Sequence, residues 1–266
     1  MKTYRMIVIV LGMLPLVACG MSSANIKVAV VKSWGSVPVF TELNDNWAAY
    51  GTVPITIDTS LMNVSSFTYD DLVNTGADVL WISDPSGIGW HYSSVEVDAV
   101  AQYAGEGHSV LGTYRVFNGV NGNSELAPVF GLRQDIEYNT SPISAGQVFN
   151  IIVEHPIFNE ISDPYISGGW PYAQVPLNDL KWDPVDLGTA QLLAQTDDGR
   201  GVITWYKTES YRAIFVSEMV EYYGNSIDTQ FLYNALTIPE PGTILLFGLG
   251  GLALLRKRRT VAREMN

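Results

Sequence analysis

Short apolar runs alternate with helix-like spacings from the start of the mature chain to its middle. Near-continuous apolar runs are typical of strands that are buried on both faces of a sheet. These runs lie at residues 26–31, 54–58, 77–83 and 109–114. Between them, apolar side chains recur at helical spacing from Phe40 to Tyr50, Thr68 caps a short helix, and residues 93–96 form a capping box. Strands that alternate with helices predict a parallel sheet covered on both faces.

The second half of the chain has a different pattern. Two strand-like runs at residues 201–206 and 212–217 predict a closing hairpin, and residues 228–236 predict a final helix. Residues 118–124 and 163–182 are rich in turn formers and are expected to be loops. We therefore expect one α/β domain over residues 25–236. Its predicted fold is flavodoxin-like, with a mostly parallel sheet, helices on both faces and a closing β-hairpin.

The amino-terminal segment has the pattern of an export signal. Lys2 and Arg5 precede an apolar run at residues 6–18, so residues 1–24 are predicted to be a secretory signal peptide that forms a helix. Two processing routes stay open. Residues 22–24 suit ordinary signal peptidase, whereas residues 16–19 resemble a bacterial lipobox in which Cys19 would be lipidated.

The carboxyl-terminal segment has the pattern of a short membrane anchor. Residues 243–255 carry no charge, and as a helix they would rise about 20 Å, against about 30 Å for a bilayer core. A block of four cations follows directly and favours the cytoplasmic side. The block consists of Arg256, Lys257, Arg258 and Arg259. We expect a membrane-associated C-terminal helix, with residues 260–266 as a cytoplasmic tail.

The order of these elements resembles a known sorting signal. Pro239, Glu240 and Pro241 stand before the apolar segment, and the cations stand behind it. This arrangement is similar to the PEP-CTERM signal, here at residues 237–259. The resemblance implies that an exosortase recognises the tripeptide in the inner membrane. The protein would then be passed to the cell surface or to the extracellular polysaccharide matrix.

The middle of the chain resembles the class I glutamine amidotransferase-like superfold, including its trehalose-utilisation-type relatives. The stretches that carry this resemblance are IKVAVV, ADVLWISDPSG, GHSVLGTY, HPIF, YRAIFVSEM and DTQFLYNAL. In active members a cysteine sits at the sharp turn after the strand that SVLGTY matches, but the residues here are Gly112, Thr113, Tyr114 and Arg115. Thiolate chemistry is therefore excluded, and Thr113 would need a nearby base that no histidine is spaced to supply. We predict no catalytic residue.

Charge and cysteine content narrow the possible partners. The chain has 27 acidic and 15 basic residues and a net charge of −12, and many of its cations lie in the two ends. Nucleic acid is therefore an unsuitable partner, whereas an extracellular polysaccharide is compatible. Cys19 is the sole cysteine, so no disulfide can form. Residues 44–46 and 197–199 stop short of a calcium-loop spacing, and we expect neither a metal nor a cofactor.

Polar and aromatic side chains follow the predicted parallel strands, where open α/β sheets bind ligands. They could stack against and hydrogen-bond a sugar, or they could pack beneath loops. The predicted pocket consists of Trp34, Asp84, Ser86, Trp90, His91, Thr113, Tyr114 and Arg115.

The sequence thus favours an exported, surface-sorted domain with a binding or structural role. Two alternatives remain. One is a secreted carbohydrate-active or other hydrolase that uses Asp84 or nearby acids at the strand ends. The other is a solute-binding surface lipoprotein anchored at Cys19.

Overall fold

The computed structural model describes residues 25–33, 37–83, 91–117, 123–134, 138–142, 148–169, 172–176, 187–222 and 225–238. The predicted signal peptide, the PEP-CTERM segment beyond Ile238 and the cytoplasmic tail lie outside these residues. No helix within the described part is long and apolar enough to cross a membrane.

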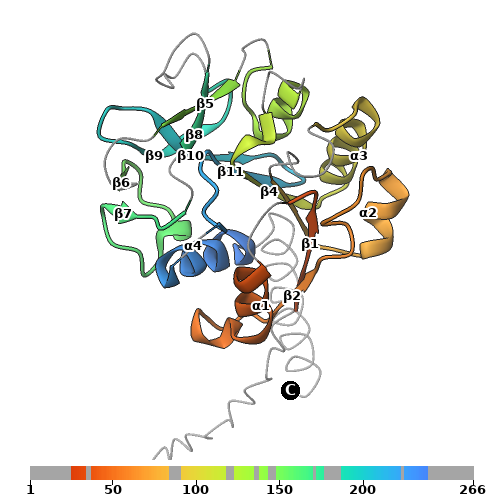
Figure 1. Cartoon of the computed structure of the whole chain (residues 1–266), viewed down its shortest axis with the longest axis horizontal. Coiled ribbons are helices and arrows are strands. Elements are labelled where there is room, and N and C mark those ends of the chain that lie inside the picture. The colour runs from red at the N-terminus through yellow and green to blue at the C-terminus, as the bar shows by residue number, and fades with distance from the viewer. Residues whose placement is uncertain are drawn as a thin grey trace, which may run out of the picture.

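The chain forms a mixed α/β structure around one large sheet (Figure 1). The strands of its first half are β1 Ile26–Val31, β2 Ile55–Asp58, β3 Val79–Ile82 and β4 Ser109–Thr113. The later strands are β5 Tyr138–Pro142, β6 Val148–Ile151, β7 Tyr165–Ile166, β8 Tyr172–Pro176, β9 Gln191–Gln195, β10 Gly201–Lys207 and β11 Arg212–Val216. The α-helices are α1 Val37–Asp45, α2 Tyr69–Thr75, α3 Ser94–Gly105 and α4 Ser226–Thr237. Shorter 3₁₀ helices include η1 Trp47–Ala49, η3 Arg115–Phe117, η5 Asn123–Phe130 and η6 Pro156–Phe158.

The nine-stranded sheet has the order β2-β1-β3-β4-β11-β10-β9-β6-β7 within the described residues. Strands β2, β1, β3, β4 and β11 are parallel, and the rest continue antiparallel through the β11–β10 hairpin. Strands β5 and β8 form a separate antiparallel pair. The α/β class and the closing hairpin are confirmed. The sheet is mixed, because β9, β6 and β7 extend it where the sequence predicted no strand.

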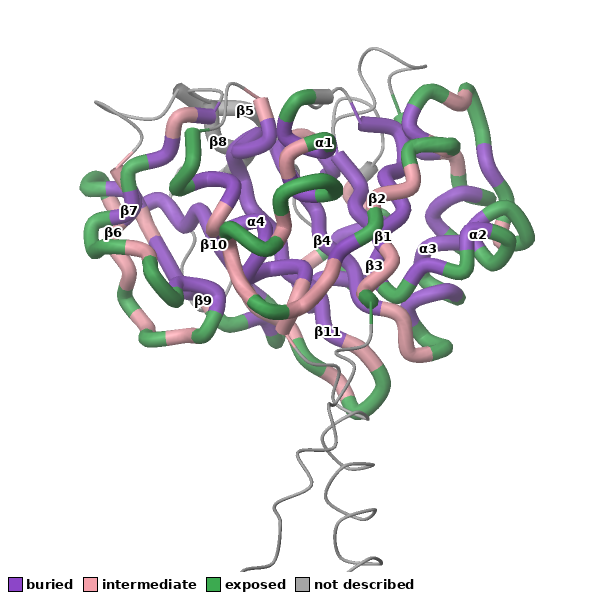
Figure 2. Tube along the Cα trace, turned by 90° about the horizontal axis from the view of Figure 1, so that it is seen from below, coloured by how far each residue is buried: buried purple, intermediate pink, exposed green. Residues whose placement is uncertain are grey.

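Helices cover both faces of the sheet, as the alternation predicted. Along β1, Val28 and Val30 enter one apolar cluster with residues of α1 and α4, whereas Ala29 and Val31 enter the other with residues of α2 and α3. Successive strand side chains point to opposite faces, so the part of β1 that is covered on both sides, Val28 to Val31, is apolar. Figure 2 shows the result, with buried strands inside and exposed positions along the outer helices.

The predicted helix starts are confirmed by their caps. The Ser93 side chain accepts from the backbone of Glu96 while Glu96 accepts from that of Ser93, and Thr68 forms the same box with Asp71. Gly76 ends α2 in the left-handed conformation, at φ 59°. The helix predicted through Tyr50 is split, because α1 ends at Asp45 and η1 follows it.

Candidate functional site

The carboxyl ends of the parallel strands meet at one edge of the sheet. Because β1, β3, β4 and β11 run in the same direction, the residues that follow them gather there. These residues include Lys32 after β1, Ser83 after β3 and Tyr114 after β4. Polar side chains from segments that are far apart in sequence therefore lie together at this edge.

A hydrogen-bonded group of three side chains lies at this edge. The Ser83 and Thr113 hydroxyls both donate to Glu221 Oε1, each at 2.5 Å, and the two hydroxyl oxygens are 2.9 Å apart. The Trp81 indole N–H donates to Thr113 Oγ1 at 3.3 Å. Ser83, Thr113 and Glu221 each have an exposed fraction of 0%. The Thr113 hydroxyl is therefore committed to a buried network.

The Glu221 carboxylate lies beside the Thr113 hydroxyl, where the sequence indicated no nearby base. It lies five positions past the end of β11, and the pairing of Val216 with Thr113 brings the two segments together. A carboxylate ordinarily has a pKa of about 4.3, far below that of an alcohol, so it is a poor base for a threonine hydroxyl. The geometry suits a structural hydrogen bond better than an activated nucleophile.

The chain turns sharply after β4. Tyr114 has a φ of 57°, in the left-handed region, and its N–H donates to Val216 O at 2.8 Å. Its side chain is 8% exposed, and the Arg115 guanidinium lies 5.8 Å from the centre of its ring. Thr113, Tyr114 and Arg115 thus lie at the carboxyl end of β4.

The other predicted site residues are less fully placed. His91 is exposed, and its backbone oxygen lies 3.4 Å from Lys32 Nζ. Four further pocket residues, Cys19 and the sorting-signal residues lie outside the described part of the chain. The four pocket residues are Trp34, Asp84, Ser86 and Trp90. The ligand pocket at this edge therefore stays a prediction.

A buried ion pair ties this edge to α3. Lys32 Nζ lies 2.6 Å from Glu96 Oε1, and both side chains are 2% exposed. Glu96 also accepts from the backbone N–H of Phe67 at 3.2 Å and from that of Ser93 at 2.7 Å. The Lys32 ammonium lies 5.5 Å from the centre of the Tyr92 ring. Sequence reasoning missed this pair because neither residue stands in a motif.

Fully buried carboxyl groups lie beside the same edge. Asp228 accepts from the N–H groups of Gly168 and Asn225, at 2.8 and 3.0 Å, and from the Tyr165 hydroxyl. Glu218 is 0% exposed, and neither of its carboxyl oxygens has a hydrogen-bond partner among the described residues. Burial raises the pKa of Glu218 well above its ordinary value, and the charges of Asp228 and Glu221 add to this effect. No group of three potential ligands within the described residues could hold a metal ion.

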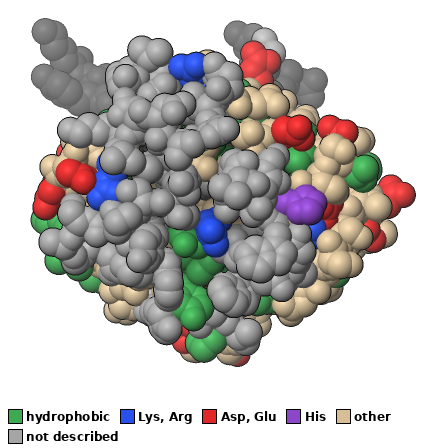
Figure 3. All heavy atoms as spheres, turned by 45° about the horizontal axis from the view of Figure 1, so that its top comes forward, with side chains coloured by type: hydrophobic (Ala, Val, Ile, Leu, Met, Phe, Trp, Pro, Cys, Tyr) green, Lys and Arg blue, Asp and Glu red, His purple; other side chains and the backbone are tan. Residues whose placement is uncertain are grey.

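Acidic side chains gather towards the rim of one face of the molecule. Figure 3 shows Asp and Glu side chains in groups towards the rim of this face, whereas Lys and Arg side chains appear singly. This distribution agrees with the chain's net charge of −12. A face of this kind disfavours polyanionic partners.

We expect Thr113→Val to lower the free energy of unfolding by about 1–2 kcal/mol, because it removes one of the two hydroxyls that Glu221 binds. Urea denaturation measures the change. Thr204→Val is the matched control, since Thr204 is 1% exposed and its hydroxyl has no hydrogen-bond partner among the described residues. Equal losses in the two variants would contradict a structural role for the Thr113 hydrogen bonds.

Comparison with known proteins confirms the carboxyl-terminal sorting motif. The PEP-CTERM protein-sorting motif matches residues 237–259, as predicted. No curated protein matches the chain. Similar solved structures include ThuA-like proteins of the trehalose-utilisation type.

The similar solved structures all have low sequence identity to this chain. A cytoplasmic protein from Salmonella typhimurium is 14% identical, with a TM-score of 0.52, and the match covers 79% of this chain and 97% of that one. A ThuA-like protein from Bacteroides uniformis is 14% identical, with a TM-score of 0.47, and the match covers 79% of this chain and 89% of that one. A β-galactosidase from Rahnella sp. R3 is 13% identical, with a TM-score of 0.49. The match covers 81% of this chain but only 32% of that enzyme.

Proposed function

We propose that this chain is an exported protein that an exosortase sorts to the cell surface or the extracellular matrix, where its α/β domain binds a ligand or serves a structural role. The observation that carries the sorting proposal is the PEP-CTERM motif at residues 237–259. Helix α4 ends at Thr237, so the motif follows the last described helix directly. Pro239, Glu240 and Pro241 would be read by the processing enzyme, and the four cations would stay on the cytoplasmic side.

The chemistry at the strand ends supports binding over catalysis. None of the four residues at the turn where active amidotransferase-like proteins carry a cysteine, Gly112 to Arg115, is a cysteine. Thr113, the one hydroxyl-bearing aliphatic residue among them, is fully buried and donates to Glu221. A buried hydroxyl that already donates to a carboxylate is poorly placed to attack a substrate. Tyr114 and Arg115, with the predicted residues around them, would form a surface for polar ligands such as saccharides.

Processing of the two ends tests the sorting proposal. We expect Pro239→Ala/Pro241→Ala to leave the full-length chain in the inner membrane, because the tripeptide is the expected recognition element. Intact mass spectrometry and cell fractionation of the chain expressed in an exosortase-containing bacterium measure the result. Gly242→Ala, just outside the tripeptide, is the control and should be processed normally.

Two outcomes would count against the proposal. Unchanged processing of the double variant, or unchanged surface delivery of a chain that ends at Leu236, would overturn exosortase-dependent sorting. The same mass measurement separates the two amino-terminal routes. A diacylglyceryl group on Cys19 would support the lipoprotein alternative, whereas a chain that begins at Asn25 would support ordinary signal cleavage.

A further inference from the structure

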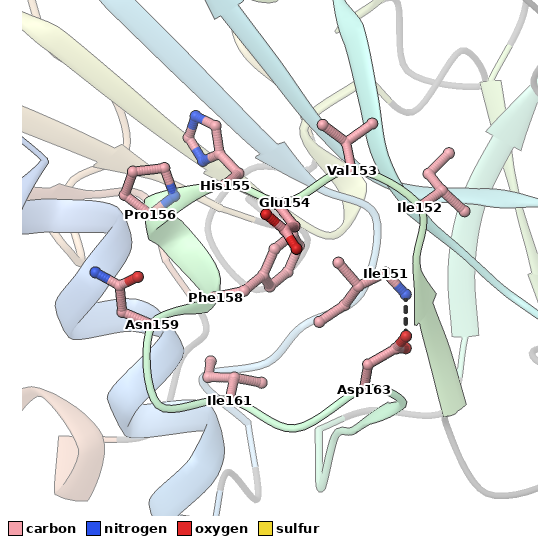
Figure 4. A pocket seen from close by; sticks show the side chains of 10 residues that line it. All are labelled: Ile151, Ile152, Val153, Glu154, His155, Pro156, Phe158, Asn159, Ile161 and Asp163. Carbon is pink, nitrogen blue, oxygen red and sulfur yellow. Dashed lines mark hydrogen bonds between the residues drawn. The ribbon is translucent and has the colours of Figure 1, made fainter.

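A cavity lies at the antiparallel end of the sheet, in the segment between β6 and β7. Its volume is about 720 Å³, and all of its lining residues fall between Ile151 and Asp163 (Figure 4). The predicted pocket at the parallel-strand ends contributes none of them. Cavities of roughly 300–1,000 Å³ are typical of small-molecule sites.

Hydrogen bonds hold the walls of this cavity in place. The Asn234 side chain in α4 donates to the backbone oxygens of Ile157 and Asn159, at 3.0 and 2.7 Å. The Ile151 N–H donates to Asp163 Oδ1 at 3.1 Å, as the dashed line in Figure 4 shows. The segment is thus hydrogen-bonded both to α4 and between its own two ends. A preformed site of this kind loses little conformational entropy when it binds a ligand.

The lining combines an apolar floor with negative charge. Figure 4 shows Ile151, Phe158 and Ile161 around the interior of the loop, and Glu154 and Asp163 are also among the lining residues. The lining includes Glu154 and Asp163 but no lysine or arginine.

The one histidine in the lining does not offset this charge. Burial lowers the pKa of His155, and the positive charge of Arg212 lowers it further. The centre of the His155 ring lies 4.5 Å from that of Trp205. At neutral pH the ring is therefore uncharged, and the carboxylates set the sign of the cavity's potential.

We propose that this cavity binds an organic ammonium group carried on an apolar or ring-shaped body. The ammonium would pair with Glu154 through charge-assisted hydrogen bonds, and the body would cover the aliphatic and aromatic floor. The net charge of −12 would also draw cations towards the protein. Two sources share this chemistry: free polyamines, and the unacetylated amino sugars of a polysaccharide. The second source rests on the proposed delivery to the extracellular matrix.

Calorimetric titration of the purified full chain in detergent tests the proposal. The probes are spermidine, a glucosamine trimer and an N-acetylglucosamine trimer, and the two trimers differ mainly in whether their nitrogens can carry charge. We expect at least one amine to bind at one site per chain, and the acetylated trimer to bind at least tenfold more weakly. Binding of spermidine alone assigns the site to free amines, and binding of the glucosamine trimer assigns it to the polymer.

Two variants locate the site. Glu154→Gln should weaken amine binding about tenfold, which corresponds to about 1.4 kcal/mol. The matched control Glu160→Gln removes the same charge from an exposed position outside the lining, and its affinity should stay within twofold of the wild type. Ile161→Trp should fill the cavity and abolish binding, and circular dichroism should show that the variant remains folded.

Three results would overturn the proposal: no binding of either amine, equal binding of the acetylated trimer, or equal losses in the Glu154 and Glu160 variants. The last would indicate general attraction to an acidic protein. The titration does not depend on export or processing. Its failure would therefore leave the sorting proposal standing, and a failure of sorting would leave the amine site standing.

Discussion

Lys32→Met is expected to lower the free energy of unfolding by about 3–5 kcal/mol, the usual loss when one partner of a buried ion pair is removed. The Lys32 and Glu96 side chains are each 2% exposed, and their charged atoms lie 2.6 Å apart. The variant would leave the Glu96 carboxylate buried without its cation, and only backbone N–H groups and the Ser93 hydroxyl would still bind it. Urea denaturation at neutral pH measures the loss.

Two comparisons show whether the pairing itself is responsible. The double variant Lys32→Met/Glu96→Gln removes both charges, so it should recover much of the stability that the single variant loses. Lys27→Met, in the strand that precedes Lys32, affects a pair with Asp58 at 4.0 Å in which the lysine side chain is 40% exposed. That variant should cost about 0–1 kcal/mol. If the loss of unfolding free energy in the double variant equalled the sum of the losses in Lys32→Met and Glu96→Gln, the interpretation would be contradicted.

Glu218→Gln is expected to stabilise the protein, by on the order of 3 kcal/mol at pH 8, because burial makes the ionised form of this carboxyl group unfavourable in the native state. Both carboxyl oxygens lack hydrogen-bond partners among the described residues, and burial raises the pKa of this group well above its ordinary value. Above the ordinary pKa of about 4.3, and up to the raised one, the native state holds a proton that the unfolded state has released. The stability of the wild type therefore falls as the pH rises through this window.

The glutamine variant cannot ionise, so its advantage should be small at pH 4 and should grow towards pH 8. Thermal unfolding at a series of pH values measures this trend. Asp228, whose pKa is also raised by burial, and Glu221 face Glu218 and remain in the variant, so part of the pH dependence should persist. Glu209→Gln, at an exposed position, controls for net charge. A constant difference between variant and wild type across the pH range would disprove the assignment to Glu218.

Local patterns predicted the parallel half of the fold well. The apolar run at residues 26–31 has the same bounds as β1, because a strand with both faces buried leaves no room for polar side chains. The capping box at residues 93–96 marked the start of α3 for an equally local reason. The antiparallel extension was not predicted. Strand β7 has two residues, and β6 includes a polar asparagine, so neither shows a clear period.

The chemistry at the strand ends depended on contacts that sequence spacing does not reveal. Thr113 was named because it lies at the turn where the family resemblance places a nucleophile, but its partner Glu221 lies 108 positions later. Their contact follows from the pairing of β4 with β11, and β11 was predicted only as one arm of a hairpin. The Lys32–Glu96 pair likewise joins the end of a strand to the cap of a helix. Long-range pairings of this kind require the strand order of the whole sheet.

The direction of the parallel strands determines how the molecule would be oriented if one of its ends were attached to a membrane. Strand β1 begins at Ile26 and β11 at Arg212, and both start at the amino edge of the parallel strands. The Arg212 guanidinium donates to Leu236 O at 3.0 Å, so α4 also finishes at that edge. If either terminus attached the molecule to a membrane, this edge of the sheet would face the lipid. Thr113 and Tyr114 would then lie at the opposite edge, away from the membrane. The molecule's outward orientation would therefore be the same whether lipid on Cys19 or the carboxyl-terminal segment held it.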